Sequence, residues 1–391
     1  MAWITGTLST AAAPFYHSEL IFPLESWHNH GSCIVEAPNG DLIVCWFHGS
    51  GERTADDVRI LGARRKAGAS DWSPPFEMAD TPAFPDTNCC MIIDPEECLW
   101  LFWPTILANR WESALMKYKV SEDYQAQDGP PVWKLEKVLH MKPGDAFPDI
   151  VRAKTDAYVA ARGNDPAHAD WARRAVDQAG DKLTRRLGWF TRAHPYITSQ
   201  GRMIVGLYSD GFDFASSIYT DDHGANWIMS EPMVGHGGIQ PSFARKQDGT
   251  LVAYLRDNGP PPQRVQVSES HDEGATWGPV SDHPLLPNPG AGLELMNLAD
   301  GRFLVIYNDT EEGRHSLAVS LSEDEGRTFR WTRHLEQSEP GKASHHYPSI
   351  IQTRDGNLHC TYSHFVRDPV TGREGKAIKH AVFNLEWLQT P

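Results

Sequence analysis

The stretch Ser270-His271-Asp272-Glu273-Gly274-Ala275-Thr276-Trp277 is a polar turn that ends on an aromatic residue. The pattern returns twice, as Thr220-Asp221-Asp222-His223-Gly224-Ala225-Asn226-Trp227 and as Ser322-Glu323-Asp324-Glu325-Gly326-Arg327-Thr328-Phe329. In each copy the aspartate can accept hydrogen bonds from its own turn, the glycine permits a positive φ, and the ring can pack against neighbouring strands. The copies begin at 220, 270 and 322. A period of about 50 residues is typical of β-propeller repeats.

Hairpin signals recur between strand-like hydrophobic runs along the whole chain. Asn-Gly and Asp-Gly dipeptides between such runs are the strongest short-range signals for a hairpin. Four turns of this kind lie at 39–40, 248–249, 300–301 and 355–356, and weaker turns lie at 95–97 and 200–201. Six hairpins, each within a unit of about four strands, predict an all-β fold, namely a six-bladed β-propeller.

The repeat fills most of the 391 residues, so we predict a single domain over 1–391. One segment, at about 165–187, is rich in Ala, Arg, Asp and Gln, and Asp165-Pro166 suits a helix N-cap and first helical residue. We therefore predict a short helical insertion in the third blade, which packs against the propeller or, alternatively, forms a lid. A strand at 3–8 is expected to close the ring against the C-terminal run 377–388.

Charge and cysteine usage indicate the class of partner and the compartment. The formal net charge of −15 disfavours nucleic acid, because phosphate binding needs a basic surface. The sequence contains no apolar run of about 18 residues that would predict a membrane span, and its first residues lack the pattern of a signal peptide. The six cysteines mostly lie inside strand-like runs, so we expect reduced core thiols in a cytoplasmic protein. Cys89-Cys90 lacks metal-site spacing, and we expect no metal and no cofactor.

The first strand of every predicted blade begins with polar residues. In a propeller these strands line the central axis, and polar groups there need partners or a ligand. We expect the side chains to form a pocket for a ligand, although a hydrated structural axis is the alternative. The residues that begin the six units include His30, Asn88, Arg192, Gln240, Glu294 and His346.

Two arginines occupy equivalent positions at the rim of adjacent units. Arg256 ends the strand-like run 251–255, and Arg314 precedes the run 316–320. Because a guanidinium group can bind a carboxylate through two hydrogen bonds, the pair predicts a site for an acidic ligand. A surface salt bridge is the alternative for either arginine alone.

The repeated turn resembles the Asp-box, or BNR, repeat of the sialidase (neuraminidase) superfamily, and the likeness covers nearly the whole chain. The resemblance implies a six-bladed propeller whose site binds the substrate carboxylate through three arginines. It also implies a tyrosine nucleophile activated by a glutamate, with an aspartate as acid and base. Tyr347 in Tyr347-Pro348-Ser349-Ile350 looks like the nucleophile, Arg256 like the second arginine and Arg314 like the third. The acid/base position falls in 51–57, where Asp56 and Asp57 are both candidates.

Two positions depart from the family pattern. His30-Gly31-Ser32 stands where the family has its first arginine, and Gln240 stands near the expected position of the activating glutamate. An amide cannot act as a base. Glu294, one unit further along the chain, is the candidate to replace that glutamate, and Arg192 is the candidate for a third contact to the carboxylate.

Three functions are compatible with these residues. The first is a glycosidase acting on a terminal acidic sugar, in which Tyr347 attacks the anomeric carbon and Asp57 or Asp56 protonates the leaving oxygen. The second is a lyase acting on a uronic-acid glycoside, with His30 or His346 and Tyr347 as base and acid. The third is a sugar-binding propeller without catalysis. We expect the glycosidase, with an acidic sugar or oligosaccharide as the partner and with Gln240, Asn88 and His346 among the residues that contact it.

Overall fold

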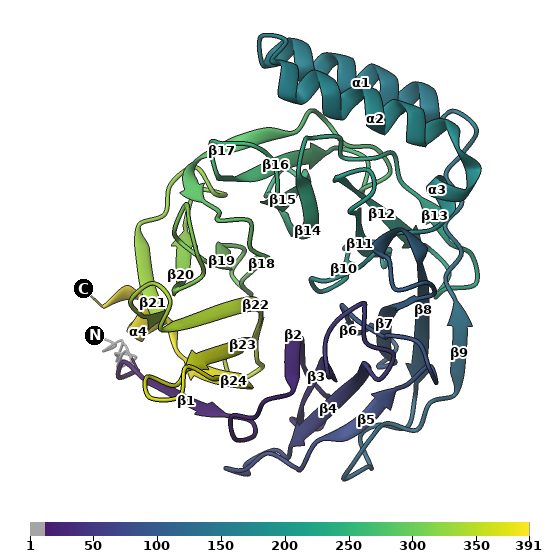
Figure 1. Ribbon diagram of the computed structural model, residues 1–391. Coiled ribbons are helices and arrows are strands. Elements are labelled where there is room, and N and C mark those ends of the chain that lie inside the picture. Colours follow the sequence, from purple (N-terminus) through teal and green to yellow (C-terminus); the bar gives the residue numbers. More distant parts are fainter. Residues whose placement is uncertain (1–11, 391) are drawn as a thin grey trace, which may run out of the picture.

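The computed structural model describes residues 12–390, which form short, mostly antiparallel β-sheets arranged in a ring around a central axis (Figure 1). The predominantly β architecture expected from the repeat is confirmed and is consistent with a β-propeller. The strand expected at 3–8 lies outside the described residues. Within 12–390, no helix is both long enough and apolar enough to span a lipid bilayer.

The first half of the ring contains two four-stranded sheets and the beginning of a longer one. The first sheet consists of β2 (His28–Glu36), β3 (Leu42–Gly49), β4 (Arg59–Arg65) and β5 (Phe76–Ala79). The second consists of β6 (Cys90–Ile93), β7 (Leu99–Ile106), β8 (Ala114–Ser121) and β9 (Leu135–Val138), with the short 3-10 helix η1 (Trp111–Ser113) between β7 and β8. The longer sheet begins with β10 (Tyr196–Ile197), β11 (Met203–Ser209), β12 (Phe214–Thr220) and β13 (Ile228–Met229).

The longer sheet continues with β14 (Gly238–Arg245), β15 (Leu251–Asp257), β16 (Arg264–Ser270) and β17 (Ser281–Pro287). A single parallel bridge, Phe214 to Gly238, joins its two halves. The next sheet consists of β18 (Glu294–Asn297), β19 (Phe303–Tyr307), β20 (Ser316–Ser322) and β21 (Trp331–Gln337). The last consists of β22 (Ala343–Gln352), β23 (Leu358–Arg367), β24 (Glu374–Phe383) and β1 (Tyr16–Leu20), and α4 (Leu385–Gln389) follows it. The number of blades thus depends on dividing the longer sheet at the Phe214 bridge.

The two ends of the described chain share one sheet. Strand β1 pairs antiparallel with β24 over its whole length, from Tyr16 opposite Phe383 to Leu20 opposite Lys379. The innermost strand of this sheet, β22, contacts β2 of the first sheet. The contacts between β22 and β2 close the ring, and the shared last sheet ties both chain ends into it.

The repeated turns have the local geometry that their residues predict. The carboxylate of Asp272 accepts hydrogen bonds from the Thr276 amide at 2.9 Å and from the Ser270 hydroxyl at 2.8 Å. Gly274 has a φ of +79° and donates its amide to the same Ser270 hydroxyl at 2.9 Å. The copies at Asp222 and Asp324 make equivalent bonds.

These turns lie at one edge of the sheets and Arg256 lies at the other. Leu251, which begins β15, pairs with Ser270 at the start of the turn, whereas Arg256 lies near the other end of the same strand. Five residues of strand separate the two positions by roughly 16 Å. The turn that begins at Ser270 and Arg256 therefore lie at opposite ends of β15.

Three helices lie between β9 and β10, outside the ring (Figure 1): α1 (Phe147–Ala161), α2 (Pro166–Gly180) and α3 (Lys182–Arg186). The prediction at 165–187 located α2 and α3, and the Asp165 side chain caps α2 by accepting the Ala167 amide at 2.8 Å. The prediction missed α1, which begins without a side-chain cap. The Trp171 indole donates to the Phe212 carbonyl at 3.0 Å, so the helices pack against the ring, as expected.

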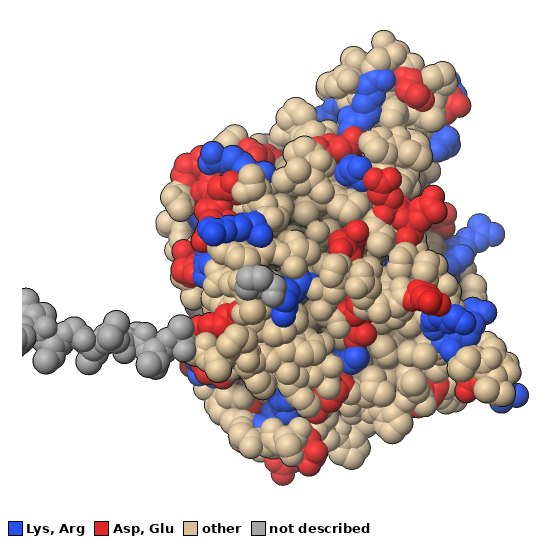
Figure 2. All heavy atoms as spheres, turned by 90° about the vertical axis from the view of Figure 1, so that its left-hand side faces the viewer, with Lys and Arg blue, Asp and Glu red and all other residues tan. Residues whose placement is uncertain are grey.

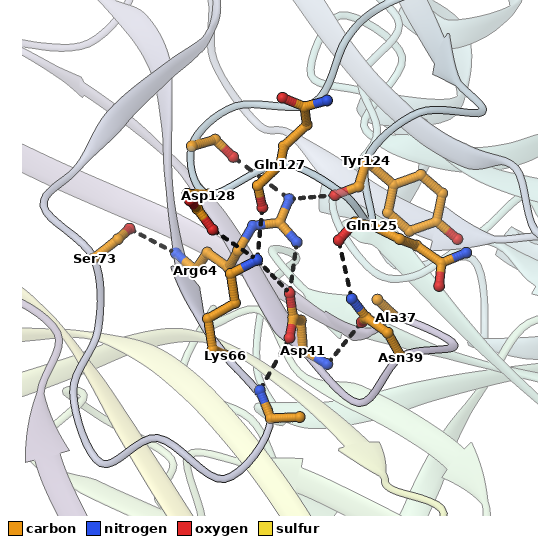
Figure 3. A network of polar contacts seen from close by, with 12 residues as sticks. Ala37, Asn39, Asp41, Arg64, Lys66, Ser73, Tyr124, Gln125, Gln127 and Asp128 are labelled. Atoms are coloured by element: carbon orange, nitrogen blue, oxygen red, sulfur yellow. Dashed lines mark hydrogen bonds and ion pairs between the residues drawn. The ribbon is translucent and has the colours of Figure 1, made fainter.

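Buried polar contacts fasten the second sheet to the first (Figure 3). The guanidinium group of Arg64 lies 3.1 Å from the carboxylate of Asp41 and donates to the Tyr124 carbonyl at 2.7 Å. Lys66 contacts Asp41 at 3.3 Å and donates to the Gln127 carbonyl at 2.8 Å. Removing one partner would leave a buried charge uncompensated, so this seam contributes to the rigidity of the ring.

One side of the molecule has acidic and basic side chains interspersed (Figure 2). All six cysteines are free thiols, and only Cys98 is partly exposed.

Candidate functional site

Several innermost strands bend at the same edge of the ring. Gly31, Asn88, Gln240 and Tyr347 have positive φ values of 64°, 44°, 55° and 46°. The ladders that contain β2, β14 and β22 shift register beside these residues. A bulge re-aims a side chain, and left-handed backbone at residues other than glycine costs energy that the surrounding structure must support. The bends therefore mark this edge as a candidate site.

Tyr347 lies at the centre of the cluster. Its hydroxyl oxygen accepts hydrogen bonds from Nη1 of Arg256 at 3.1 Å and from Nε2 of Gln240 at 3.3 Å. The guanidinium carbons of Arg192 and Arg314 lie 5.2 Å and 5.7 Å from the centre of its ring. The structure therefore brings together five residues that the sequence singled out, from three sheets and the loops that adjoin them.

The arginines are held by backbone and side-chain acceptors. Arg314 donates to the Gly290 carbonyl at 2.7 Å and to Nδ1 of His346 at 2.8 Å. Arg256 donates to Oδ1 of Asn258 at 3.1 Å, and Arg192 donates to the Pro348 carbonyl. These contacts fix the direction of each guanidinium group without a carboxylate partner.

Several buried polar atoms of the cluster have no hydrogen-bond partner within residues 12–390. They are Nε and Nη1 of Arg192, Nε of Arg256 and Oε1 of Gln240. Unpaired buried groups are rare in folded proteins, because each costs about 1–3 kcal/mol. A ligand or a water that bound these atoms would remove that cost.

His30 and His346, two histidines beside Tyr347, are neutral at pH 7. The His30 ring lies 4.5 Å from the Tyr347 ring, and its Nδ1 lies 3.0 Å from the Ser363 hydroxyl. Burial, then the charges of His346, His28 and the nearby arginines, hold the pKa of His30 well below its usual value. Burial and Arg314 lower the pKa of His346 in the same way. Neutral imidazoles can accept protons, as the lyase hypothesis requires.

Gly292 lets the tyrosine and an arginine meet. A Cβ at this position would lie 2.4 Å from Cδ1 of Tyr347 and 2.9 Å from Nε of Arg192. The sequence showed only a glycine-rich strand entry there, and the need for glycine becomes visible only once the two side chains are placed.

Glu294 lies in the same part of the molecule, but its carboxylate has other partners. It accepts the backbone amides of His194 and Ile350, each at 3.0 Å, and also bonds the His194 ring. Burial raises the pKa of Glu294, but the charge and hydrogen bonds of His194 outweigh burial, and the pKa lies below its usual value. The structure shows no contact between Glu294 and the Tyr347 hydroxyl. The role predicted for Glu294 as an activating base stays a prediction without geometric support.

In the acidic segment 51–57, the carboxylate that lies nearest to the cluster histidines is Glu52, not Asp56 or Asp57. The carboxylate of Asp57 accepts the Ser50 amide at 3.1 Å, and that of Asp56 accepts the Asn109 side chain at 2.8 Å, both on the surface. Glu52 instead lies 3.1 Å from Nε2 of His28. Burial raises the pKa of Glu52, but His28, with Arg53 and Arg314, lowers it by more, so this carboxyl is ionised at pH 7.

A second carboxyl that the sequence missed follows β11. Asn88 donates to the Tyr208 hydroxyl at 2.6 Å, and Asp210 lies two residues after that tyrosine. Solvent reaches Asp210, yet desolvation by the surrounding protein raises its pKa to about 6. Nothing in the sequence distinguished Asp210 from any other turn aspartate.

A large cavity lies elsewhere. It has a volume of about 810 Å³ and is lined by residues of the first and last sheets, among them Arg65 and Arg354. Their charges are already paired with Glu19 and Glu36. The volume alone therefore does not identify the site.

Two groups of described residues could each offer three ligand atoms to a metal: Glu336, His345 and His364, and Asp94, Glu96 and His223. In the first group the ammonium of Lys379 already contacts Glu336, so a cation occupies that position. In the second, Glu96 and His223 are exposed and paired with each other at 2.8 Å. Neither group adjoins the Tyr347 hydroxyl through any contact that the structure shows.

Comparisons with known proteins match this chain to sialidases. Residues 170–360 match a family described as a BNR repeat-like domain. A sialidase of Micromonospora viridifaciens is 28% identical over 183 residues, which cover 44% of this chain and 26% of that protein. An exo-alpha-sialidase of Aspergillus fumigatus is 23% identical and is covered over 94% of its length, with 99% of this chain. An anhydrosialidase of Macrobdella decora is 24% identical, and only 31% of its length is covered.

The fold is similar to that of solved sialidase structures. The intramolecular trans-sialidase of Ruminococcus gnavus, in complex with oseltamivir carboxylate, superposes with a TM-score of 0.68 at 12% identity. The superposition covers 93% of this chain and 96% of that one. At this level of identity the likeness concerns the fold.

Proposed function

From the premise that this chain belongs to the sialidase superfamily of BNR-repeat proteins, we propose that it is a sialidase-like glycoside hydrolase. Its substrate is a terminal sugar that carries a carboxylate. We further propose that the ring is a six-bladed propeller, with the longer sheet divided at the Phe214 bridge.

One observation carries the proposal: Arg256 donates to the Tyr347 hydroxyl while its Nε has no partner within the described chain. Arg314 approaches the same ring from the neighbouring sheet. Guanidinium groups bind carboxylates in a planar, bidentate geometry. An acidic sugar bound there would place its anomeric centre beside a tyrosine oxygen.

In the proposed mechanism Tyr347 attacks the anomeric carbon and forms a covalent glycosyl intermediate. A neutral attacking group suits an anionic sugar, and tyrosine nucleophiles are the exception that sialidases make among glycosidases. Gln240 donates to the Tyr347 oxygen but cannot accept its proton. The neutral imidazole of His30, whose ring lies 4.5 Å from the Tyr347 ring, is the proton acceptor in this proposal.

A second function has an observation of its own in its favour. Gln240 replaces a base, and a neutral histidine contacts the tyrosine, which suits a lyase acting on a uronic-acid glycoside. In such a reaction His30 would remove the proton next to the carboxylate, and Tyr347 would donate one to the leaving oxygen.

A panel of sialosides and uronic-acid glycosides separates these functions. We expect release of reducing sugar without the ultraviolet absorbance of a new C=C bond. The appearance of that absorbance, lost on His30→Ala, would establish the lyase. Ligand binding without turnover of any glycoside would leave a sugar-binding propeller.

A further inference from the structure

We propose that Asp210, on the loop between β11 and β12, is the proton donor to the leaving oxygen of the substrate. The assignment rests on the glycosidase function proposed above. It moves the acid out of the segment 51–57, where the family resemblance locates it.

The position of Asp210 directly after β11 brings it near the cluster. Tyr208 is the last residue but one of β11, which ends at Ser209, and its hydroxyl accepts from Asn88 at 2.6 Å. The charges of Asp210 and Tyr347 both act on Tyr208 and, after burial, raise its pKa. Asp210 therefore lies in the turn directly after β11, close enough to Tyr208 for its charge to act on a tyrosine that borders the site.

The loop that carries Asp210 is held against Gly237 and against Asn258, which follows the strand β15 that contains Arg256. The Gly237 amide donates to the Asp213 carbonyl at 2.9 Å, and the Asn258 side chain donates to the Asp213 carboxylate at 3.3 Å. The same Asn258 accepts from Arg256 at 3.1 Å. Phe212, which is buried, stacks on Phe214 with ring centres 4.9 Å apart. The distance between the carboxyl and the arginine is thus set by packed residues.

The chemistry of the carboxyl suits a general acid. Desolvation raises the pKa of Asp210 to about 6; Arg256 opposes this shift, Asp213 and Glu112 add to it, and Arg53 opposes it. No hydrogen bond or ion pair within residues 12–390 engages the carboxyl, so its proton is available to a ligand. A carboxylic acid that donates near neutral pH needs a raised pKa of this kind.

The other carboxyls of this edge are less suitable. Glu52 is ionised and paired with His28. Asp56 and Asp57 lie on the surface, where their carboxylates accept hydrogen bonds from Asn109 and Ser50. Glu294 is buried and bonded to His194.

The bond from the anomeric carbon to the leaving oxygen breaks, and that oxygen takes the proton of Asp210 as the Tyr347 oxygen bonds to the carbon. The phenolic proton passes to neutral His30. In the second step Asp210, now a carboxylate, takes a proton from the attacking water. The Tyr347 oxygen leaves the carbon and regains its proton from His30.

The test compares two substrates with different leaving groups, the methylumbelliferyl sialoside and sialyllactose, or the matching uronides if the panel identifies those. Asp210→Asn should lower kcat/KM for the disaccharide by about 10²–10⁴-fold, and by less than about tenfold for the aryl glycoside, whose leaving group needs little protonation. The decline of wild-type activity above about pH 6 should disappear in this variant. Added azide should restore turnover and yield a glycosyl azide.

Asp56→Asn and Asp57→Asn are the matched controls and should keep the wild-type dependence on the leaving group. Two results for Asp210→Asn would overturn the assignment: equal losses of kcat/KM on both substrates, or an activity that still declines above pH 6. A control variant that loses kcat/KM on the disaccharide alone would also overturn it. Asp210→Glu keeps a carboxyl at this position, and its thermal unfolding is followed in parallel to detect a folding defect. Activity on the disaccharide above that of Asp210→Asn supports the acid role. A loss as large as that of Asp210→Asn, at an unchanged melting temperature, opposes it. Wild-type protein that cleaves no acidic glycoside would overturn the proposed function itself.

Discussion

The two edges of the same sheets follow different rules. At the edge with the repeated turns, Asp272 and its equivalents satisfy their hydrogen bonds within eight residues of chain. At the opposite edge, the Tyr347 hydroxyl depends on Arg256 and Gln240 of another sheet, and several neighbouring donors have no partner within residues 12–390. Hydrogen bonds made within one turn stabilise the fold. Polar groups that converge from distant segments and lack partners are free to bind a ligand.

The largest effect is expected at the unsatisfied edge. Tyr347→Phe should lower kcat/KM by at least about 10³-fold, because it removes the nucleophilic oxygen. Steady-state kinetics on the best substrate of the panel measures the loss. Tyr124→Phe is the control, since its hydroxyl bonds the Glu97 carbonyl at 2.8 Å, outside the site, and it should retain activity. Full activity in Tyr347→Phe would exclude both proposed reactions.

Removal of a guanidinium group should have the next largest effect. Arg256→Ala should raise KM or Kd for the acidic sugar by about 10²-fold, equivalent to about 3 kcal/mol, because a desolvated charge contact is lost. Isothermal titration with the free acidic sugar gives the affinity directly. Arg202→Ala, which removes an ion pair to Asp221 near a repeated turn, should leave the affinity unchanged. Equal affinity in both variants would refute the carboxylate clamp.

A substitution at the satisfied edge should affect stability instead. Asp272→Ala should lower the free energy of unfolding by about 1 kcal/mol, through the lost hydrogen bonds of one turn. Chemical denaturation measures this loss, and the kcat of the folded fraction should remain that of the wild type. A selective loss of kcat would show that the two edges are coupled.

The smallest expected effect is a dependence of stability on acid. Hydrogen bonds from Asn226 lower the pKa of Asp222; at Asp272 and Asp324 burial raises the pKa, but hydrogen bonds from Thr276 and Thr328 outweigh it. A carboxyl whose pKa is lower in the folded state stabilises the fold above its unfolded pKa of about 3.9. This stability should be lost as the pH falls below about 4. Melting temperatures recorded from pH 6 to pH 3 for wild type and Asp272→Asn should converge as the pH falls.

The sequence by itself determined the features that depend on neighbouring residues. The three turns, their period and the helix cap at Asp165 arise from contacts within a few positions, so the β architecture and the location of α2 were predictable. Arg256 and Arg314 were predicted as site residues from their equivalent rim positions in adjacent units, and Tyr347 from the resemblance to the sialidase superfamily. Their convergence is what the structure then shows.

Tertiary structure decided which polar groups meet. Glu294 is paired with His194 across 100 residues of chain, and Glu52 rather than Asp56 or Asp57 contacts His28. The pKa of Asp210 depends on Arg256, Glu112 and Arg53, which come from other segments of the chain. Such contacts depend on the curvature of the ring and on desolvation. Neither is encoded in the spacing of residues, because both arise only when distant strands pack together.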